Sequence, residues 1–271
     1  MTTRTIPRVL AIAGSDSGGG AGIQADVKTI TMLGGHAMTA ITAITAQNTT
    51  GVSAVVAVPP ETVIAQIDAV AWDIGVDAIK IGMIGAADTA WRVAERLAQP
   101  DLAGVPIVVD PVMVATSGAV LADEATIAAF AALMAAATFV TPNAPELAVL
   151  TGRAIDDEDD MRVAAGALAA AHKIAVLAKG GHLPGDTVVD LLVTSAGAVQ
   201  RRAADRIRTT STHGTGCTLS SALATGLAAG LSPIDAVDQA RAFVRAALLA
   251  APGLGRGHGP IGHMLGRPHF P

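Results

Sequence analysis

Residues 212–222 read T-H-G-T-G-C-T-L-S-S-A and place a glycine loop directly before a helix. Gly214 and Gly216 flank Thr215, so the backbone there can adopt positive φ angles and lie close to a ligand. The small-residue pattern of residues 218–230 predicts the helix. Because the first N–H groups of a helix have no internal partner and lie at the positive end of its dipole, we expect a phosphate or a developing oxyanion to bind here.

Cys217 is the only cysteine of the chain and falls in the first turn of this helix. A helix N-terminus favours the thiolate, so we expect a lowered pKa and a thiol able to act on a substrate hydroxyl. The alternative is a small apolar core residue beside an ordinary loop. A single cysteine excludes an internal disulfide and fits a reducing compartment.

The composition excludes several classes of protein. The chain has 271 residues, is 51% apolar and only 2% aromatic, and carries a formal charge of −5. No cluster of lysine and arginine indicates a nucleic-acid or anionic-membrane partner. The two long uncharged runs, 125–145 and 209–234, contain prolines or many Gly, Ser and Thr residues, so neither predicts a membrane-spanning helix. With no recognisable signal peptide, we expect a soluble, cytoplasmic protein.

Short apolar runs alternate with helical patterns along the chain. The predicted strands are residues 8–13, 37–47, 78–81, 106–109, 139–141, 174–177, 187–194 and 198–203, and a lysine, Lys80, is unusual within the third. The predicted helices are residues 23–33, 60–72, 88–97, 125–136, 145–150, 156–171, 218–230 and 233–250. This alternation predicts an α/β fold of three layers, a mainly parallel central sheet with helices on both faces, in one domain of residues 1–271.

Two familiar kinds of site are absent from the sequence. The glycine loop of residues 15–22 has neither a P-loop nor a G-x-G-x-x-G spacing, because Ile23 stands where the last glycine is required. The seven histidines are scattered and form no zinc motif. We expect His213 to be a positioning residue. We expect the three histidines of the Gly/Pro-rich tail, His258, His263 and His269, to be exposed.

Polar side chains follow the predicted strands at one edge of the sheet. Gln47, Asp110, Asn143 and Lys179 stand at or just beyond strand ends, and Glu146 falls in the next helical turn. Each has an ordinary alternative as a turn former, cap or surface residue. Together, at the edge where open α/β sheets bind ligands, they favour phosphate transfer. The acids could hold Mg²⁺ through water, and the lysine could neutralise phosphate.

Seven motifs are distributed over nearly the whole length of the chain. They are A-G-S-D-S-G-G-G-A-G-I-Q-A-D (13–26), I-T-A-Q-N-T-T-G-V (44–52), K-I-G-M-I (80–84), D-P-V-M (110–113), T-P-N-A-P-E (141–146), K-G-G-H (179–182) and the stretch 212–222. On these motifs the chain resembles the hydroxymethylpyrimidine/phosphomethylpyrimidine kinases of thiamine biosynthesis, in the ribokinase-like superfamily. Cys217 supports this family, because most ribokinase-like sugar kinases have aspartate there.

The resemblance implies a homodimeric kinase that uses ATP and Mg²⁺. Its substrate would be 4-amino-5-hydroxymethyl-2-methylpyrimidine, phosphorylated first on the hydroxymethyl group and then on the resulting phosphate. No thiamine-phosphate synthase domain follows in this sequence, so we expect a kinase alone rather than a fusion. The open alternatives are a pyridoxal kinase and a non-catalytic pyrimidine-binding regulator.

The resemblance also implies roles for individual residues. Gln47 would hydrogen-bond the aminopyrimidine, and its pocket would be lined or shaped by Asp26, Gly14, Ala21 and Met83. The metal and phosphates would be organised by Asp110, Asn143 and Glu146, with Lys179 on the nucleotide side. The anion hole would comprise Gly214, Thr215, Gly216 and Cys217, with Cys217 as the base for the hydroxymethyl proton.

Overall fold

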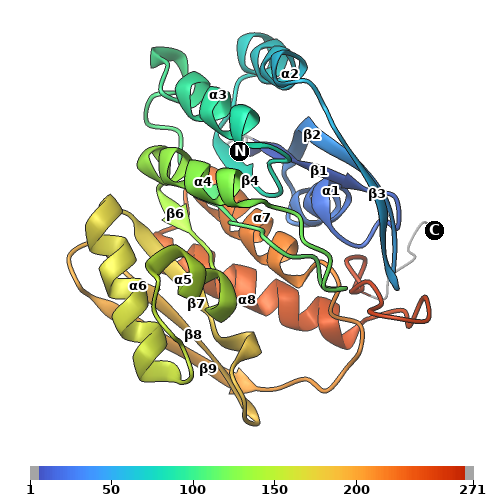
Figure 1. The fold of residues 1–271 in the computed structure, drawn as a ribbon, viewed down its shortest axis with the longest axis vertical. Coiled ribbons are helices and arrows are strands. Elements are labelled where there is room, and N and C mark those ends of the chain that lie inside the picture. Colours follow the sequence, from blue (N-terminus) through green and yellow to red (C-terminus); the bar gives the residue numbers. More distant parts are fainter. Residues whose placement is uncertain (1–5, 266–271) are drawn as a thin grey trace, which may run out of the picture.

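The computed structural model describes residues 6–265, in which nine strands form one sheet. The strand order across the sheet is β3-β2-β1-β4-β5-β6-β7-β8-β9 (Figure 1). The strands are β1 (Arg8–Asp16), β2 (His36–Asn48), β3 (Gly51–Ala57), β4 (Ala78–Ile81), β5 (Ile107–Val109), β6 (Phe139–Val140), β7 (Ala175–Lys179), β8 (Thr187–Val193) and β9 (Val199–Asp205).

The centre of the sheet is parallel. Strands β2, β1, β4, β5, β6 and β7 pair in parallel, whereas β3 pairs antiparallel with β2, and β8 with β7 and β9. The helices are α1 (Gly22–Met32), α2 (Pro60–Asp73), α3 (Ala87–Leu97), α4 (Glu124–Ala136), α5 (Ala144–Thr151), α6 (Glu158–His172), α7 (Thr215–Ala228) and α8 (Pro233–Leu249). Two 3-10 turns, η1 (Pro100–Leu102) and η2 (Gly180–His182), complete the elements.

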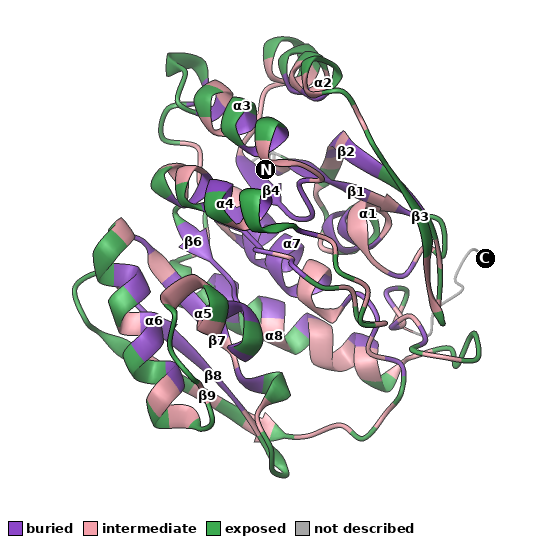
Figure 2. Cartoon of the chain, viewed as in Figure 1, coloured by how far each residue is buried: buried purple, intermediate pink, exposed green. Residues whose placement is uncertain are grey.

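Helices cover both faces of the sheet. Successive strand side chains point to opposite faces, so that Leu10 and Ile12 of β1 pack into the core under α2 to α6, while Val9 packs into the core under α1, α7 and α8. Figure 2 shows the central strands and the inner sides of the helices as buried. The expected three-layer α/β architecture is confirmed.

Strand β3 is the element that the sequence does not predict. Its seven residues G-V-S-A-V-V-A are half-buried or exposed, so they carry no alternation of buried and exposed positions. The strand exists because it pairs with the end of β2, which is longer than the neighbouring strands. The other predicted strands and helices form, with ends that differ by a few residues.

No helix within residues 6–265 has the length and apolar character required to cross a membrane.

Candidate active site

A cavity of about 760 Å³ opens along the carboxyl ends of the parallel strands. One end lies between the glycine loop after β1, the end of β2 and the loop 112–121, and the other lies between η2, β8 and α8. Helix α7 begins between these two ends. Of the residues expected at the site, the cavity is lined by Gly14, Ala21, Gln47, Met83, Asp110, Asn143, Glu146, Lys179, Gly214, Thr215, Gly216 and Cys217.

At the start of α7, Gly214 has no room for a side chain and Gly216 lies close to charged groups. Gly214 is the N-cap with φ +87°, and a Cβ there would collide with the carbonyl oxygen of Gly20. A Cβ on Gly216 would lie 3.3 Å from Lys179 Nζ and 3.4 Å from Asp110 Oδ2. The glycines therefore let the positive end of the helix reach both the glycine loop and a charged pair, as an anion site requires.

That charged pair consists of Lys179 and Asp110. Lys179 Nζ donates to Asp110 Oδ1 at 2.8 Å and lies 3.8 Å from Glu146 Oε2. Thr141 Oγ1 donates to the same Asp110 oxygen at 3.0 Å. Burial alone would lower the pKa of Lys179, but the two carboxylates raise it above its usual value, so the ammonium stays charged beside the cavity.

Glu146 is held by the start of α5. Asn143 Oδ1 accepts from the Glu146 N–H at 2.9 Å, and the Asn143 N–H donates to Glu146 Oε2 at 2.8 Å, which is a capping box. Burial raises the pKa of Glu146 to about 7, and Asp110 adds to the rise while Lys179 opposes it. Asn143 lines the cavity, but its side-chain oxygen is already used to position Glu146.

The expectation of a lowered thiol pKa for Cys217 is wrong. Burial raises this pKa to about 11, although Lys80 and a hydrogen bond from the Gly22 backbone act in the opposite direction. The physical reason is that the thiolate loses its water in the cavity wall, and this cost outweighs the field of the helix end. Cys217 is therefore a protonated thiol at neutral pH.

The other end of the cavity has polar and apolar walls. The pairing of β2 with β3 shifts register between Ala46 and Gln47, and such a bulge re-aims the side chain at the strand end. Gln47 is half-buried there. In the apolar part of the wall, Met83 lies against Gly14, where a Cβ would be only 3.0 Å from the sulfur. Gly14 thus leaves room for Met83 in the wall.

Asp26 does not line the cavity, contrary to the expectation. It is fully buried, and both of its carboxylate oxygens accept from Lys80 Nζ at 2.9 Å. Ser221 Oγ also donates to it, at 2.7 Å. Asp26 lies on the buried face of α1, and it links this helix to Lys80 of β4 and Ser221 of α7 instead of contacting a ligand. The lysine within a buried strand was the signal for this pair.

Asp16 and His213 form a third pair. The sequence indicated His213 as a positioning residue but did not reveal its partner. Asp16 accepts the N–H groups of Gly18, Gly20 and Ala21 at 2.8–3.0 Å, and His213 Nε2 lies 2.8 Å from Asp16 Oδ2. Burial alone would raise the pKa of Asp16, but these hydrogen bonds hold it below its usual value. The pair fixes the glycine loop against the entry to α7.

The described histidines of the C-terminal tail differ in solvent exposure. His258 is exposed as expected, but His263 is buried, with Nε2 2.8 Å from Thr218 Oγ1 of α7. The tail residue is covered because residues 259–263 pack back against α7 and α8. His269 lies outside the described residues.

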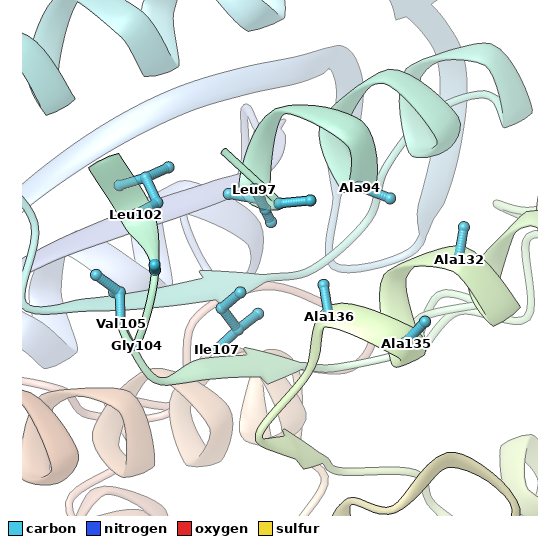
Figure 3. Close-up of a pocket in the computed structure, with 11 residues that line it drawn as sticks. Ala94, Leu97, Leu102, Gly104, Val105, Ile107, Ala132, Ala135 and Ala136 are labelled. Carbon is cyan, nitrogen blue, oxygen red and sulfur yellow. The ribbon is translucent and has the colours of Figure 1, made fainter. Parts of the chain in front are cut away.

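A smaller recess of about 370 Å³ lies at the opposite edge of the sheet, between α3, η1 and α4 (Figure 3). Every residue that lines it is apolar, mostly alanine and leucine. Because ligand sites need a few convergent polar groups to fix orientation, this recess is not a candidate active site.

Comparison with known proteins identifies the family. The family model described as phosphomethylpyrimidine kinase matches residues 16–262. The chain belongs to this family. The hydroxymethylpyrimidine/phosphomethylpyrimidine kinase of Rhizobium meliloti is 51% identical over 94% of this chain and 96% of its own length. The thiamine biosynthesis bifunctional protein ThiED of Geobacter sulfurreducens is 48% identical over 95% of this chain, which spans only 52% of that protein.

Solved structures agree with this assignment to a kinase family of thiamine biosynthesis. The phosphomethylpyrimidine kinase of Clostridium difficile has a TM-score of 0.77 and 38% identity, covering 89% of this chain and 98% of the other. The pyridoxal kinase of Staphylococcus aureus in complex with AMP-PCP and pyridoxal has a TM-score of 0.86 and 33% identity, covering 96% and 94%. The fold is therefore shared by kinases of two different ring substrates.

Proposed function

We propose that this protein transfers the γ-phosphoryl group of ATP to 4-amino-5-hydroxymethyl-2-methylpyrimidine, and then phosphorylates the monophosphate to the diphosphate in the same cavity. One observation carries the proposal: the start of α7, with Cys217, lines the same cavity as Gln47 and the Lys179–Asp110–Glu146 cluster, with His213 beside Gln47 and Gly216 beside Lys179 and Asp110. Phosphoryl transfer depends mainly on positioning and charge stabilisation, which this arrangement supplies.

Lys179 and the first N–H groups of α7 would stabilise the phosphoryl group in transfer. The ammonium is held by Asp110 yet is 13% exposed toward the cavity, so an anion can approach it. Glycines at positions 214 and 216 keep side chains out of the path. Preorganised donors of this kind act where negative charge develops and need no rearrangement during the reaction.

Cys217 would act as base in the first phosphorylation only. Its raised pKa means that the resting group is a thiol. To act as base it must first lose its own proton to solvent, and the nearby Lys80 ammonium favours the thiolate that this leaves. The thiolate then takes the hydroxymethyl proton as the O–P bond forms and becomes a thiol again. In the second step the acceptor is already an anionic phosphate, so no strong base is required. A neutral thiol admits that anion more easily than a carboxylate does.

The carboxylates fit a magnesium ion that arrives with ATP and keeps several waters. Asp110 and Glu146 would hold it, since hard cations prefer oxygen ligands and Mg²⁺ commonly uses one or two carboxylates. Within the described part of the chain, Glu146 Oε1 accepts no hydrogen bond, which leaves it available. Asn143 would contribute by positioning Glu146. When bound, the ion neutralises charge on the transferred phosphate.

A pyridoxal kinase is the second candidate, favoured by the high similarity to the S. aureus enzyme. AMP-PCP in that enzyme also supports ATP as donor here. The decisive experiment is mass spectrometry of products after incubation with Mg·ATP and either ring substrate. Pyrimidine mono- and diphosphate would establish the proposed function. Pyridoxal phosphate without pyrimidine products would replace it with the alternative, and no product would favour a binding protein.

We also propose a cytoplasmic homodimer. Ile44 of β2 and Val56 of β3 are cross-strand partners and are 55% and 64% exposed. Such an apolar ribbon at a sheet edge favours contact with another chain. Light scattering should give twice the mass of one chain, and Val56→Asp should reduce it. A monomeric mass for the unaltered protein would refute the dimer.

A further inference from the structure

The carboxamide of Gln47 lies between two fixed partners, Thr45 and His213, in the part of the cavity beside the glycine loop. Its backbone is held by Ser17, whose Oγ accepts the Gln47 N–H at 2.8 Å and donates to the Gln47 carbonyl at 2.7 Å. Its Oε1 lies 3.2 Å from Thr45 Oγ1, and its Nε2 lies 3.4 Å from His213 Nε2. The polarity of these two partners decides which way the amide must face.

Thr45 can only accept a hydrogen bond from Gln47. A threonine hydroxyl has one proton, and Thr45 Oγ1 donates to the Ser15 carbonyl at 2.9 Å. With Oε1 on the Thr45 side, that single proton would have to serve two acceptors. The amide NH₂ on this side would instead donate to a free lone pair of the hydroxyl.

His213 Nε2 cannot accept a hydrogen bond from Gln47. Its Nε2 is 2.8 Å from Asp16 Oδ2, and the hydrogen bonds to that carboxylate hold the pKa of Asp16 low, so Asp16 is an acceptor. The Nε2 atom must therefore carry a proton. A Gln47 NH₂ group facing this N–H would place two hydrogen-bond donors against each other. The Gln47 side-chain oxygen in the same position would be attracted to the N–H dipole. This second argument is independent of Thr45.

We propose that Thr45 and the Asp16–His213 pair fix the Gln47 amide with Nε2 toward Thr45 and Oε1 toward His213, and that this fixed polarity determines the specificity for the 4-aminopyrimidine ring. The amide oxygen and nitrogen have nearly the same shape, so a half-turn costs no space. It gains a hydrogen bond to Thr45 and removes the opposition of two donors at His213, whose Nε2 proton remains directed at Asp16. Thr45 is thereby a specificity-determining residue that acts through Gln47. The inference rests on the proposed function.

The fixed amide distinguishes two ring edges. The 4-amino ring offers a donor, the amino group, next to an acceptor, the ring nitrogen. Oε1 and the second N–H of Nε2 match this edge. The 4-oxo analogue offers an acceptor next to a ring N–H, which is the reverse pattern. An amide free to rotate would accept either ring, whereas a fixed amide leaves the 4-oxo ring with unpaired polar groups.

The test compares phosphorylation of the 4-amino compound and its 4-oxo analogue by the unaltered protein, Thr45→Val and Thr45→Ser. Valine keeps the shape and removes the hydroxyl, and serine keeps the hydroxyl. We expect the ratio of kcat/KM for the two compounds to fall by about five- to tenfold in Thr45→Val, the typical effect of one neutral hydrogen bond. Thr45→Ser should retain the ratio. Thermal unfolding identifies any variant that is not folded.

An equal loss for both compounds in Thr45→Val would mean that Thr45 only shapes the pocket, and would overturn the inference. A loss of the ratio in Thr45→Ser would overturn it as well. Calorimetric dissociation constants of both compounds provide the same ratio without turnover. If the unaltered protein binds the 4-amino compound selectively but phosphorylates neither, the proposed kinase function fails while the inference about Gln47 stands.

Discussion

Two lysine–aspartate pairs contact helix α7 at Ser221 and Gly216, and they differ in access to the cavity. Lys80 and Asp26 are fully buried, and Ser221 of α7 donates to the carboxylate. Lys179 and Asp110 are 13% and 2% exposed, and Gly216 of α7 lies directly against them. The first pair is sealed between α1, β4 and α7, while the second has a second carboxylate, Glu146, and faces the cavity.

The difference indicates which pair maintains the fold and which is available for chemistry. In the sealed pair, both carboxylate oxygens of Asp26 accept from one ammonium. Burial alone would lower the pKa of Lys80, but Asp26 and neighbouring groups raise it, so the lysine remains charged. In the open pair the ammonium can also meet an incoming phosphate. The same two residue types therefore serve different purposes because of burial.

Breaking the sealed pair should have the largest effect. Lys80→Met leaves the Asp26 charge buried without its partner, and such changes cost about 3–5 kcal/mol of unfolding free energy. Urea unfolding measures this loss. Removing both charges in Lys80→Met with Asp26→Leu should restore most of the stability. If Lys80→Met were as stable as the unaltered protein, the pair would not maintain the fold and the contrast between the two pairs would be lost.

Breaking the open pair should reduce activity rather than stability. In Lys179→Met the ammonium beside the cavity is lost, and removal of one preorganised charge-stabilising group typically lowers kcat by about 10²–10³-fold. Steady-state kinetics with Mg·ATP measures this, and urea unfolding provides the comparison with Lys80→Met. An active Lys179→Met protein would contradict the role of Lys179 in stabilising the transferred phosphate.

The comparison also shows what the sequence could predict. The sequence predicted that the polar residues at the strand ends lie together, because the carboxyl ends of parallel strands meet at one edge of the sheet. In the structure, Lys179 lies 2.8 Å from Asp110 and 3.8 Å from Glu146. Asp26 was misplaced, because a motif match does not reveal which side of a helix faces the core. The lysine of a buried strand was noticed, but its partner lies 54 positions away along the chain, and only the packing of α1 on β4 reveals it.

Other features were beyond the sequence for a similar reason. The thiol pKa of Cys217 depends on the balance between a helix end and lost water, and the second quantity requires the folded structure. The pairing of Asp16 with His213 joins residues 197 positions apart. Strand β3 has no buried face, so periodicity gave no signal for it.

The thiol between the two pairs provides a third test, by its reactivity. With a pKa of about 11 instead of the usual 9.0, Cys217 should carry roughly a hundredfold less thiolate than a free cysteine at neutral pH. The alkylation rate with iodoacetamide should rise about tenfold per pH unit from pH 7 to 10 without a plateau. Cys217→Ser is the blank, since the chain has no other cysteine. A plateau below pH 8 would restore the expectation of an activated thiol.

The smallest expected effect concerns Glu146, the second carboxylate beside the open pair, and it appears as a pH dependence of stability. Burial raises the pKa of Glu146 to about 7 from 4.5, so between these values the folded protein binds more protons than the unfolded chain. The unfolding free energy should then decrease as pH rises through this window. In Glu146→Gln this contribution disappears, so the variant should lose less stability than the unaltered protein between pH 5 and pH 7.5, as urea unfolding without nucleotide or Mg²⁺ would measure.

Glu124→Gln, at an exposed helix start, is the matched control and should leave the slope unchanged. The same slope in the Glu146→Gln and unaltered proteins would mean that Lys179 keeps Glu146 ionised, so that the open cluster would be as fully paired as the sealed one.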